Sequence, residues 1–217
     1  MKILVVFYSM TGNVAKLAEA VASGAENFGA EVRLRQVSEL ISQESIDKNP
    51  DLKRAKESLK HIPLATNDDL RWADGVCFGS PTRYGNMSAQ LKNFIDQTGE
   101  LWVSGELVGK VAACFTSSST QHGGQESTLL SMMVPLFHLG FVVQGLPYSV
   151  QTQMGMGTIH GGSPYGVSSV SGGDAKRLPV GEDLEMARAL GRLVAESAGK
   201  MRASTQTFDD KAALRAS

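Results

Sequence analysis

Three times along this chain, an apolar strand-like run ends in a short polar loop that leads into an amphipathic helical pattern. The runs are KILVVFY at residues 2–8, DGVCFG at 74–79 and the segment 110–115. They are apolar without alternation, which is typical of strands buried on both faces of a parallel sheet. With two further strands expected at 31–37 and 141–143, this order predicts an α/β fold with a doubly wound, five-stranded parallel sheet and helices on both faces.

Composition limits the partners of such a domain. The 217 residues carry 21 basic and 22 acidic side chains, so no excess of positive charge is available to hold a nucleic acid or an anionic membrane. No apolar run approaches the roughly 20 residues of a membrane span, and the first residues do not complete a signal peptide. Cys77 and Cys114 lie in apolar runs, which favours buried thiols over a disulfide. We therefore expect a cytoplasmic protein without membrane insertion or a nucleic-acid partner.

Residues 1–200 are expected to form one domain, followed by a flexible C-terminal tail at 201–217. Two segments do not follow the alternation of strands and helices. Residues 38–73 are polar, contain one short helical pattern and are interpreted as a connection. Residues 146–180 are rich in glycine and proline, and compact domains rarely keep so long an irregular segment without a functional or subunit-contact reason. A helical pattern at 181–197 closes the domain.

The polar loops are expected to share one edge of the sheet. In doubly wound sheets, ligands bind beyond the carboxyl ends of the strands, where the winding reverses. The first loop is formed by Ser9, Met10, Thr11, Gly12, Asn13 and Val14. It precedes a helix, whose first backbone N–H groups have no intrahelical partner, so these groups and the hydroxyls of Ser9 and Thr11 can bind a phosphate without a lysine.

The first loop contains neither GxxxxGK[ST] nor GxGxxG. This argues against a P-loop and against a dinucleotide-binding turn, and it favours a terminal monophosphate. The alternative is an ordinary helix-capping turn, because Ser, Thr and Asn are also favoured there.

The second and third loops add different chemistry. The second is formed by Pro81, Thr82, Arg83, Tyr84 and Gly85, and the third contains Ser117, Ser118, Ser119, Thr120, Gln121 and His122. A planar cation and an aromatic face suit a flat heteroaromatic ring, with an ion-paired surface arginine as the alternative. The hydroxyls and amides of the third loop suit a polar ligand, with a flexible linker as the alternative. In the helix that follows, Pro135 predicts a kink or an interruption.

No His, Cys and Asp side chains have the spacing of zinc ligands, so no metal is expected. His61 and His160 stand in polar or glycine-rich surroundings and are expected at the surface.

The motifs YSMTGN, GSPTRYGNMSAQLKNFIDQTG, LWVSGELVGK, TQHGGQE and GGSPYG resemble the WrbA family of flavodoxin-like NAD(P)H:quinone oxidoreductases, over about residues 2–200. The resemblance implies a flavodoxin-like fold that binds FMN. The phosphate would lie in the loop at residues 9–14, and the isoalloxazine ring between residues 82–85 and 117–122.

The resemblance also assigns roles to two residues outside the loops. His138 matches a histidine that reaches the flavin site, and Trp102 matches a tryptophan at the substrate face. It further implies a homotetramer whose active sites draw on more than one subunit. Two positions depart from the family pattern. Thr11 replaces an aromatic residue, which calls into question any stacking of the nicotinamide nucleotide there, and Leu139 stands where a second histidine is common.

The implied activity is that of an FMN-dependent NAD(P)H dehydrogenase (quinone). NADH or NADPH would reduce FMN, which would pass two electrons to a quinone in a ping-pong scheme, and no side chain would be catalytic by itself. Arg83 could tune the flavin or contact the adenylate part of the donor. Two other classes remain open: a flavodoxin-type electron carrier, although such carriers are usually strongly acidic, and a cofactor-free regulatory interaction protein.

Overall fold

The computed structural model describes the backbone of residues 1–216 and the side chains of residues 1–203. Within this part of the chain, one sheet contains six strands: β1 (Lys2–Phe7), β2 (Glu31–Gln36), β3 (Gly75–Pro81), β4 (Val111–Ser118), β5 (Val142–Val143) and β6 (Val167–Val170). The helices are α1 (Asn13–Asn27), α2 (Gln43–Asp47), α3 (Pro50–Leu59), α4 (Asn67–Trp72), α5 (Ala89–Asp96), α6 (Gly99–Ser104), α7 (Gln125–His138) and α8 (Gly181–Ala216), with a 3-10 turn η1 (Gln151–Met154).

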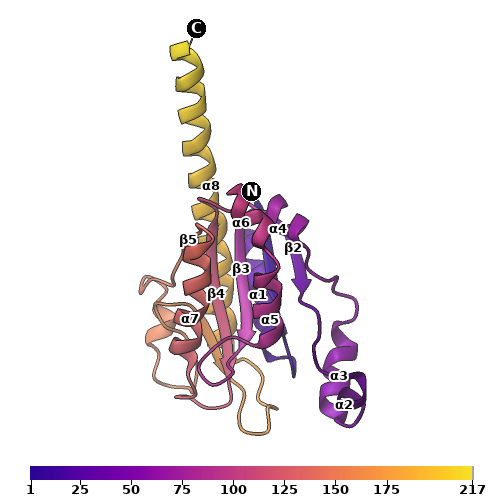
Figure 1. Cartoon of the computed structure of the whole chain (residues 1–217). Coiled ribbons are helices and arrows are strands. Elements are labelled where there is room, and N and C mark those ends of the chain that lie inside the picture. The colour runs from indigo at the N-terminus through magenta and orange to yellow at the C-terminus, as the bar shows by residue number, and fades with distance from the viewer. Residues whose placement is uncertain (217) are drawn as a thin grey trace.

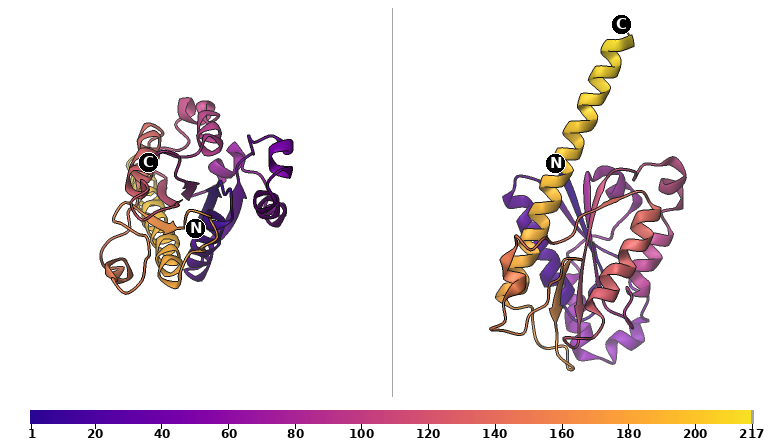
Figure 2. Two further views of the ribbon diagram at one scale, coloured as in Figure 1. Left: turned by 90° about the horizontal axis from the view of Figure 1, so that it is seen from below. Right: turned by 90° about the vertical axis from the view of Figure 1, so that its left-hand side faces the viewer.

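The sheet has the strand order β2-β1-β3-β4-β5, and every pairing in it is parallel within the described residues. The chain passes from β1 to β2 on one side and then returns to β3 on the other side of β1, so the winding reverses between β1 and β3. Helices α1 and α8 cover one face of the sheet, and α4 to α7 cover the other (Figures 1 and 2). The predicted doubly wound fold is therefore confirmed.

Strand β1 is apolar from Ile3 to Phe7 because its alternate side chains enter two different cores. Ile3 is buried in the core beneath α1 and α8, whereas Leu4 is buried in the core beneath α5 and α7. Helices α1 and α8 lie so close that a Cβ atom on Gly24 would be 1.9 Å from the backbone oxygen of Arg188. Glycine at this position is therefore required by the close approach of the two helices.

The fifth position in the sheet is divided between two short strands. β5 pairs with Val111 and Ala112, and β6 pairs with residues 115–118, so both lie along the same edge of β4. The residues between them, 144–166, form an insert within this edge strand. The sequence prediction missed β6 because its sequence, VSSV, offers too few apolar residues, yet all four of its side chains are buried.

The connection between β2 and β3 contains more regular structure than expected. Residues 38–73 include α2, α3 and α4, where the sequence predicted one short helix. Each helix begins at a side-chain cap, because Ser42, Asn49 and Thr66 accept hydrogen bonds from backbone N–H groups of the first turn. This connection places α3 beside the carboxyl end of the sheet (Figure 1).

Two helices differ from their predicted extents. Helix α7 runs through Pro135 without interruption, since a proline removes one backbone donor while the neighbouring bonds remain, including that from Leu139 N–H to the Pro135 carbonyl (3.0 Å). Helix α8 continues to Ala216, past the pattern predicted for 181–197. The flexibility of residues 201–217 stays a prediction.

Among the described residues, every helix is too short or too polar to span a membrane.

His160, expected at the surface, is held inside the insert by both ring nitrogens. Nδ1 lies 2.6 Å from the carbonyl oxygen of Gly161, and Nε2 lies 2.7 Å from that of Gly155. Carbonyl oxygens only accept hydrogen bonds, so both bonds form only when the ring carries two protons. Burial opposes this charge, but the two hydrogen bonds and the charges of Asp183 and Glu182 raise the pKa of His160 above its ordinary value.

The His160 contact predicts a pH-dependent stability. Because the pKa is raised in the folded protein, the stabilisation is fully present below the unfolded pKa of about 6.5 and is lost as pH rises through the folded pKa. The free energy of unfolding should therefore fall as the pH rises above about 6.5 in the wild type, and this part of the fall should be absent in His160→Gln. Urea unfolding at several pH values measures it, with exposed His61→Gln as the matched control. Identical pH profiles for wild type and His160→Gln would contradict the assignment.

Candidate functional site

Four loops meet at the carboxyl end of the sheet, where the winding reverses. They follow β1, β3, β4 and β6 and lie at the lower end of the molecule in Figure 1. The loops enclose a cavity of about 140 Å³, lined by Ser9, Met10, Thr11, Asn13, Val14, Pro81, Thr82, Arg83, Ser117, Ser118, Ser119, Ser171 and Ala175. All except Ser171 and Ala175 are residues that the sequence predicted for a cofactor site.

The first loop presents free backbone donors to this cavity. Gly12 adopts a left-handed conformation (φ 102°) at the N-cap of α1, and the Ser9 hydroxyl accepts hydrogen bonds from the N–H groups of Gly12 and Ala15 (both 3.2 Å). In the described chain, the N–H groups of Asn13 and Val14 donate no hydrogen bond. With the positive end of the helix dipole beside them, these groups form an anion-binding site.

Asn13 supplies a second unsatisfied group. Its side chain is buried, and its Nδ2 donates to the carbonyl oxygen of Ala175 (3.5 Å). Its Oδ1 is also buried and has no hydrogen-bond partner among the described residues. A buried acceptor without a donor is costly in a native structure. A ligand with hydroxyl groups as well as a phosphate would satisfy both Oδ1 and the free amides.

The Arg83 guanidinium is available to a ligand. It donates to the carbonyl of Thr82 (2.8 Å) and contacts the sulfur of Met10 (2.8 Å). No carboxylate of the described residues forms an ion pair with Arg83. The alternative interpretation of Arg83 as an ion-paired surface arginine is therefore wrong. The cavity therefore combines free amides with a cation that has no carboxylate partner.

Two non-glycine residues at the site have positive φ angles. Tyr84 (φ 54°) and Gly85 (φ 78°) form the centre of a tight turn closed by reciprocal backbone bonds between Arg83 and Asn86 (2.7 and 3.0 Å), and Ala175 has φ 57°. A left-handed conformation costs such a residue roughly 1–2 kcal/mol. The Tyr84 ring is fully exposed. Backbone strain of this kind clusters at ligand sites.

The walls of the cavity are fixed by hydroxyl and amide groups. The Thr128 hydroxyl of α7 donates to the Thr82 hydroxyl (2.7 Å), and the Ser169 hydroxyl of β6 donates to that of Ser117 (3.1 Å). Gln125 donates from Nε2 to the Ser118 hydroxyl (3.0 Å). These bonds anchor the third loop to a helix and a strand. The alternative interpretation of this loop as a flexible linker is therefore wrong.

Several predicted residues lie outside the cavity wall. Gly12 and Gly85 shape their turns, Tyr84 projects into solvent, and Thr120, Gln121 and His122 continue the third loop beyond Ser119.

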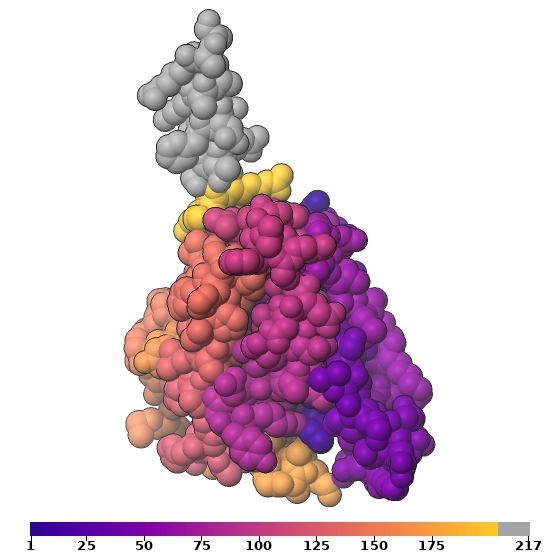
Figure 3. Space-filling model, in the orientation of Figure 1, coloured from indigo at the N-terminus to yellow at the C-terminus, as the bar shows by residue number. Residues whose placement is uncertain are grey.

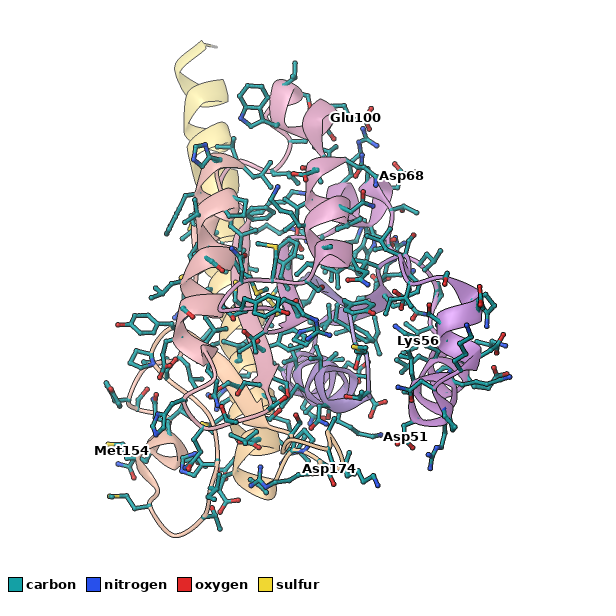
Figure 4. All side chains as sticks on the ribbon, turned by 60° about the horizontal axis from the view of Figure 1, so that its bottom comes forward. Asp51, Lys56, Asp68, Glu100, Met154 and Asp174 are labelled. Carbon is teal, nitrogen blue, oxygen red and sulfur yellow. The ribbon has the colours of Figure 1, made fainter. Side chains whose placement is uncertain are left out.

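His138 and Trp102 lie elsewhere, in a cleft of about 270 Å³ between α6 and α7. Helix α7 starts beside the cavity and ends at His138, which at about 1.5 Å per residue is roughly 20 Å away. Figure 4 shows Glu100, on α6, at the end of the molecule opposite to Asp51 and Asp174, which flank the strand-end loops. Within one chain, the structure does not bring His138 or Trp102 to the cavity.

Ser171 and Ala175 were not predicted from the sequence, although a signal was present. The order of short strand, glycine-rich loop and helix occurs a fourth time, in VSSV, SGGDAKRLPV and GEDLEM. The loop is held against β4 because Ser171 N–H donates to the Ser118 carbonyl (2.8 Å).

Neither metal nor thiol chemistry is indicated by the described residues. They contain no group of three His, Cys, Asp or Glu side chains placed to hold a metal ion. Cys77 and Cys114 are free and buried, and burial raises the pKa of both thiols.

Comparison with known proteins assigns the chain to a family. The family model described as NADPH-dependent FMN reductase matches residues 1–153. A protein of Aromatoleum aromaticum named NAD(P)H dehydrogenase (quinone) is 51% identical over 202 residues, covering 93% of this chain and 97% of the relative. One of the same name from Syntrophobacter fumaroxidans is 52% identical over 202 residues, covering 93% and 98%.

A comparison with a solved structure supports the same family assignment. A protein from Agrobacterium tumefaciens described as a flavodoxin, WrbA-like protein has 25% sequence identity and a TM-score of 0.59, covering 92% of this chain and 98% of that one. These matches confirm the resemblance drawn from the sequence motifs. The chain belongs to the NADPH-dependent FMN reductase family and, within it, to the WrbA-like NAD(P)H dehydrogenases (quinone).

Proposed function

We propose that this protein is an FMN-dependent NAD(P)H dehydrogenase (quinone) whose FMN binds in the cavity at the carboxyl end of the sheet. The observation that carries the proposal is the set of unsatisfied groups in the first loop, namely the free N–H groups of Asn13 and Val14 and the orphaned Asn13 Oδ1. A phosphate accepts hydrogen bonds and ribityl hydroxyls donate them, so FMN matches both kinds of group. The names of relatives about 50% identical support the same activity.

When bound, FMN supplies the redox chemistry, accepting a hydride from NADH or NADPH and passing two electrons to a quinone. The protein positions the participants. In this proposal the first loop holds the phosphate, Thr82 and Arg83 form one wall of the ring site, and Ser117, Ser118 and Ser119 form the other. Arg83 places a positive charge at this wall, where it stabilises negative charge. Donor and quinone would bind in turn at the open side of the cavity, which is the basis of the proposed ping-pong scheme.

We further propose a homotetramer in which His138 and Trp102 act at the cavity of another subunit. Their distance from the cavity of their own chain excludes a role there in a single subunit. Three exposed apolar side chains on α7, Leu130, Val134 and Phe137, form a stripe with helical spacing beside the cleft. Such a stripe is typical of a subunit interface. The segment of α7 lies on the face of the molecule that Figure 3 shows. The two buried free thiols are consistent with a cytoplasmic location.

The activity is testable without a partner protein. Purified full-length protein supplied with FMN should oxidise NADH or NADPH with benzoquinone as the acceptor, with parallel lines in initial-rate plots. Its molar mass in sedimentation should be four times the 23.1 kDa of the chain. Flavin binding without this activity would instead favour a flavodoxin-type electron carrier, and no flavin binding would favour a cofactor-free interaction protein.

Thr11→Asp tests the phosphate site. The new carboxylate would face the FMN phosphate across a few ångströms, so the dissociation constant for FMN should rise at least about tenfold. Quenching of flavin fluorescence measures this constant, with Thr152→Asp in the insert as the matched control. Unchanged affinity in Thr11→Asp would place the phosphate elsewhere.

Trp102→Ala tests the substrate face. Trp102 is 61% exposed in the single chain, so its replacement should leave folding and FMN affinity intact. The value of kcat/KM for the quinone should fall, because an aromatic surface that contacts the substrate is lost. Steady-state kinetics with benzoquinone measure the effect. Loss of FMN together with loss of the folded state would mean that Trp102 has a structural role instead.

A further inference from the structure

A half-buried ion-pair network lies behind the first loop, and the proposed function does not use it. Lys56, on α3, pairs with Glu39, and its Nζ donates to the backbone carbonyl oxygen of Ser9 (2.9 Å). The same Nζ lies 4.1 Å from the centre of the Tyr8 ring. The side chains of Lys56 and Glu39 are only 17% and 22% exposed. Figure 4 shows Lys56 on α3, at the edge of the strand-end loops.

Glu39 is held as a carboxylate by many donors. It accepts hydrogen bonds from the Tyr8 hydroxyl (3.0 and 3.1 Å), from Gln90 Nε2 (2.9 Å) and from the N–H groups of Leu40 (2.8 Å) and Ile41 (2.9 Å). Burial opposes its charge, but the hydrogen bonds outweigh burial and lower the pKa of Glu39 to about 2. The carboxylate is therefore charged at neutral pH, and its ion pair with Lys56 holds the ammonium in place.

The contact of Lys56 with Ser9 bears directly on the phosphate site. Asn13 is the first residue of α1, so its N–H has no acceptor within the helix, and it has no other partner in the described chain. The carbonyl of Ser9 accepts from Lys56, and the hydroxyl of the same residue accepts from the N–H groups of Gly12 and Ala15. Lys56 thus holds the backbone of the first loop at the residue that caps α1, next to the free amide of Asn13.

We propose that Lys56 is a positioning residue for the FMN phosphate, and that Glu39 holds Lys56 in place. Lys56 keeps the first loop in the conformation that leaves the amide of Asn13 open, and its charge balances that of Glu39. Without Lys56, the Ser9 carbonyl is free and an unbalanced carboxylate lies behind the loop. The inference rests on the proposed binding of FMN in the cavity.

The test compares FMN with riboflavin, which lacks the phosphate. In full-length Lys56→Met, the dissociation constant for FMN should rise about 10- to 100-fold, the range expected for a hydrogen bond to a charged group. The constant for riboflavin should change by less than about threefold, because riboflavin has no phosphate to bind the amide that Lys56 keeps open. Fluorescence quenching measures both constants for each variant after flavin removal by dialysis.

Two further variants complete the design. Lys53→Met, on the same helix, removes a lysine whose partner Asp47 lies at the surface, and it should leave both constants unchanged. Glu39→Gln/Lys56→Met leaves no unbalanced buried charge if Lys56→Met alone does not fold. The double variant should still lose more affinity for FMN than for riboflavin.

An equal loss for the two flavins, or no loss, would overturn the role of Lys56. Failure of the wild-type protein to bind FMN would instead overturn the proposed function, so the two failures are distinguishable.

Discussion

The first turn of a helix cannot satisfy its own backbone N–H groups, and the site of this protein is organised around that constraint. Ser9 satisfies the N–H groups of Gly12 and Ala15, and those of Asn13 and Val14 have no partner in the described chain. The strand order then brings the second, third and fourth loops to the same place. A chain with balanced charge can hold an anion in this way, because the donors are peptide groups and not lysines.

The rest of the site keeps these donors in one geometry. Hydroxyl and amide bonds join β4 to α7 and β6, and Lys56 holds the carbonyl of Ser9. Tyr84 and Ala175 retain unfavourable backbone angles. Such strain persists only where the surrounding structure determines the conformation. The arrangement is therefore prepared before a ligand arrives, which lowers the entropy lost on binding.

The sequence predicted the fold because its signal is local and strong. KILVVFY is apolar in every residue that enters the two cores, and this pattern has few structural solutions. The polar loops were recognised for the same reason, since each follows such a strand. β6 was missed because Ser168 and Ser169 look like loop residues, and only the contacts with Gln125 and Ser117 explain their burial.

The Lys56 network lay beyond the sequence prediction for a different reason. Glu39 and Lys56 stand in a polar connection at a spacing that no motif describes, and their burial results from the docking of α3 against the first loop. For His138 the reverse holds, because the sequence suggested a role that its position in the single chain does not explain. The resemblance assigned it to a flavin site, whereas the direction of α7 places it at the far end of its own chain. Residue roles that depend on three-dimensional neighbours need the fold, and those shared between subunits need the assembly.

The division of the fifth strand has an evolutionary consequence. The insert leaves the sheet after β5 and returns before β6, and its two ends are joined by the bond from Leu146 N–H to the Pro164 carbonyl (3.0 Å). Everything beyond that bond can change in length without shifting the register of either short strand on β4. Closing a longer loop adds little entropic penalty. Natural variation can thus reshape the periphery of the molecule while the cavity-lining segment after β6 stays unaltered.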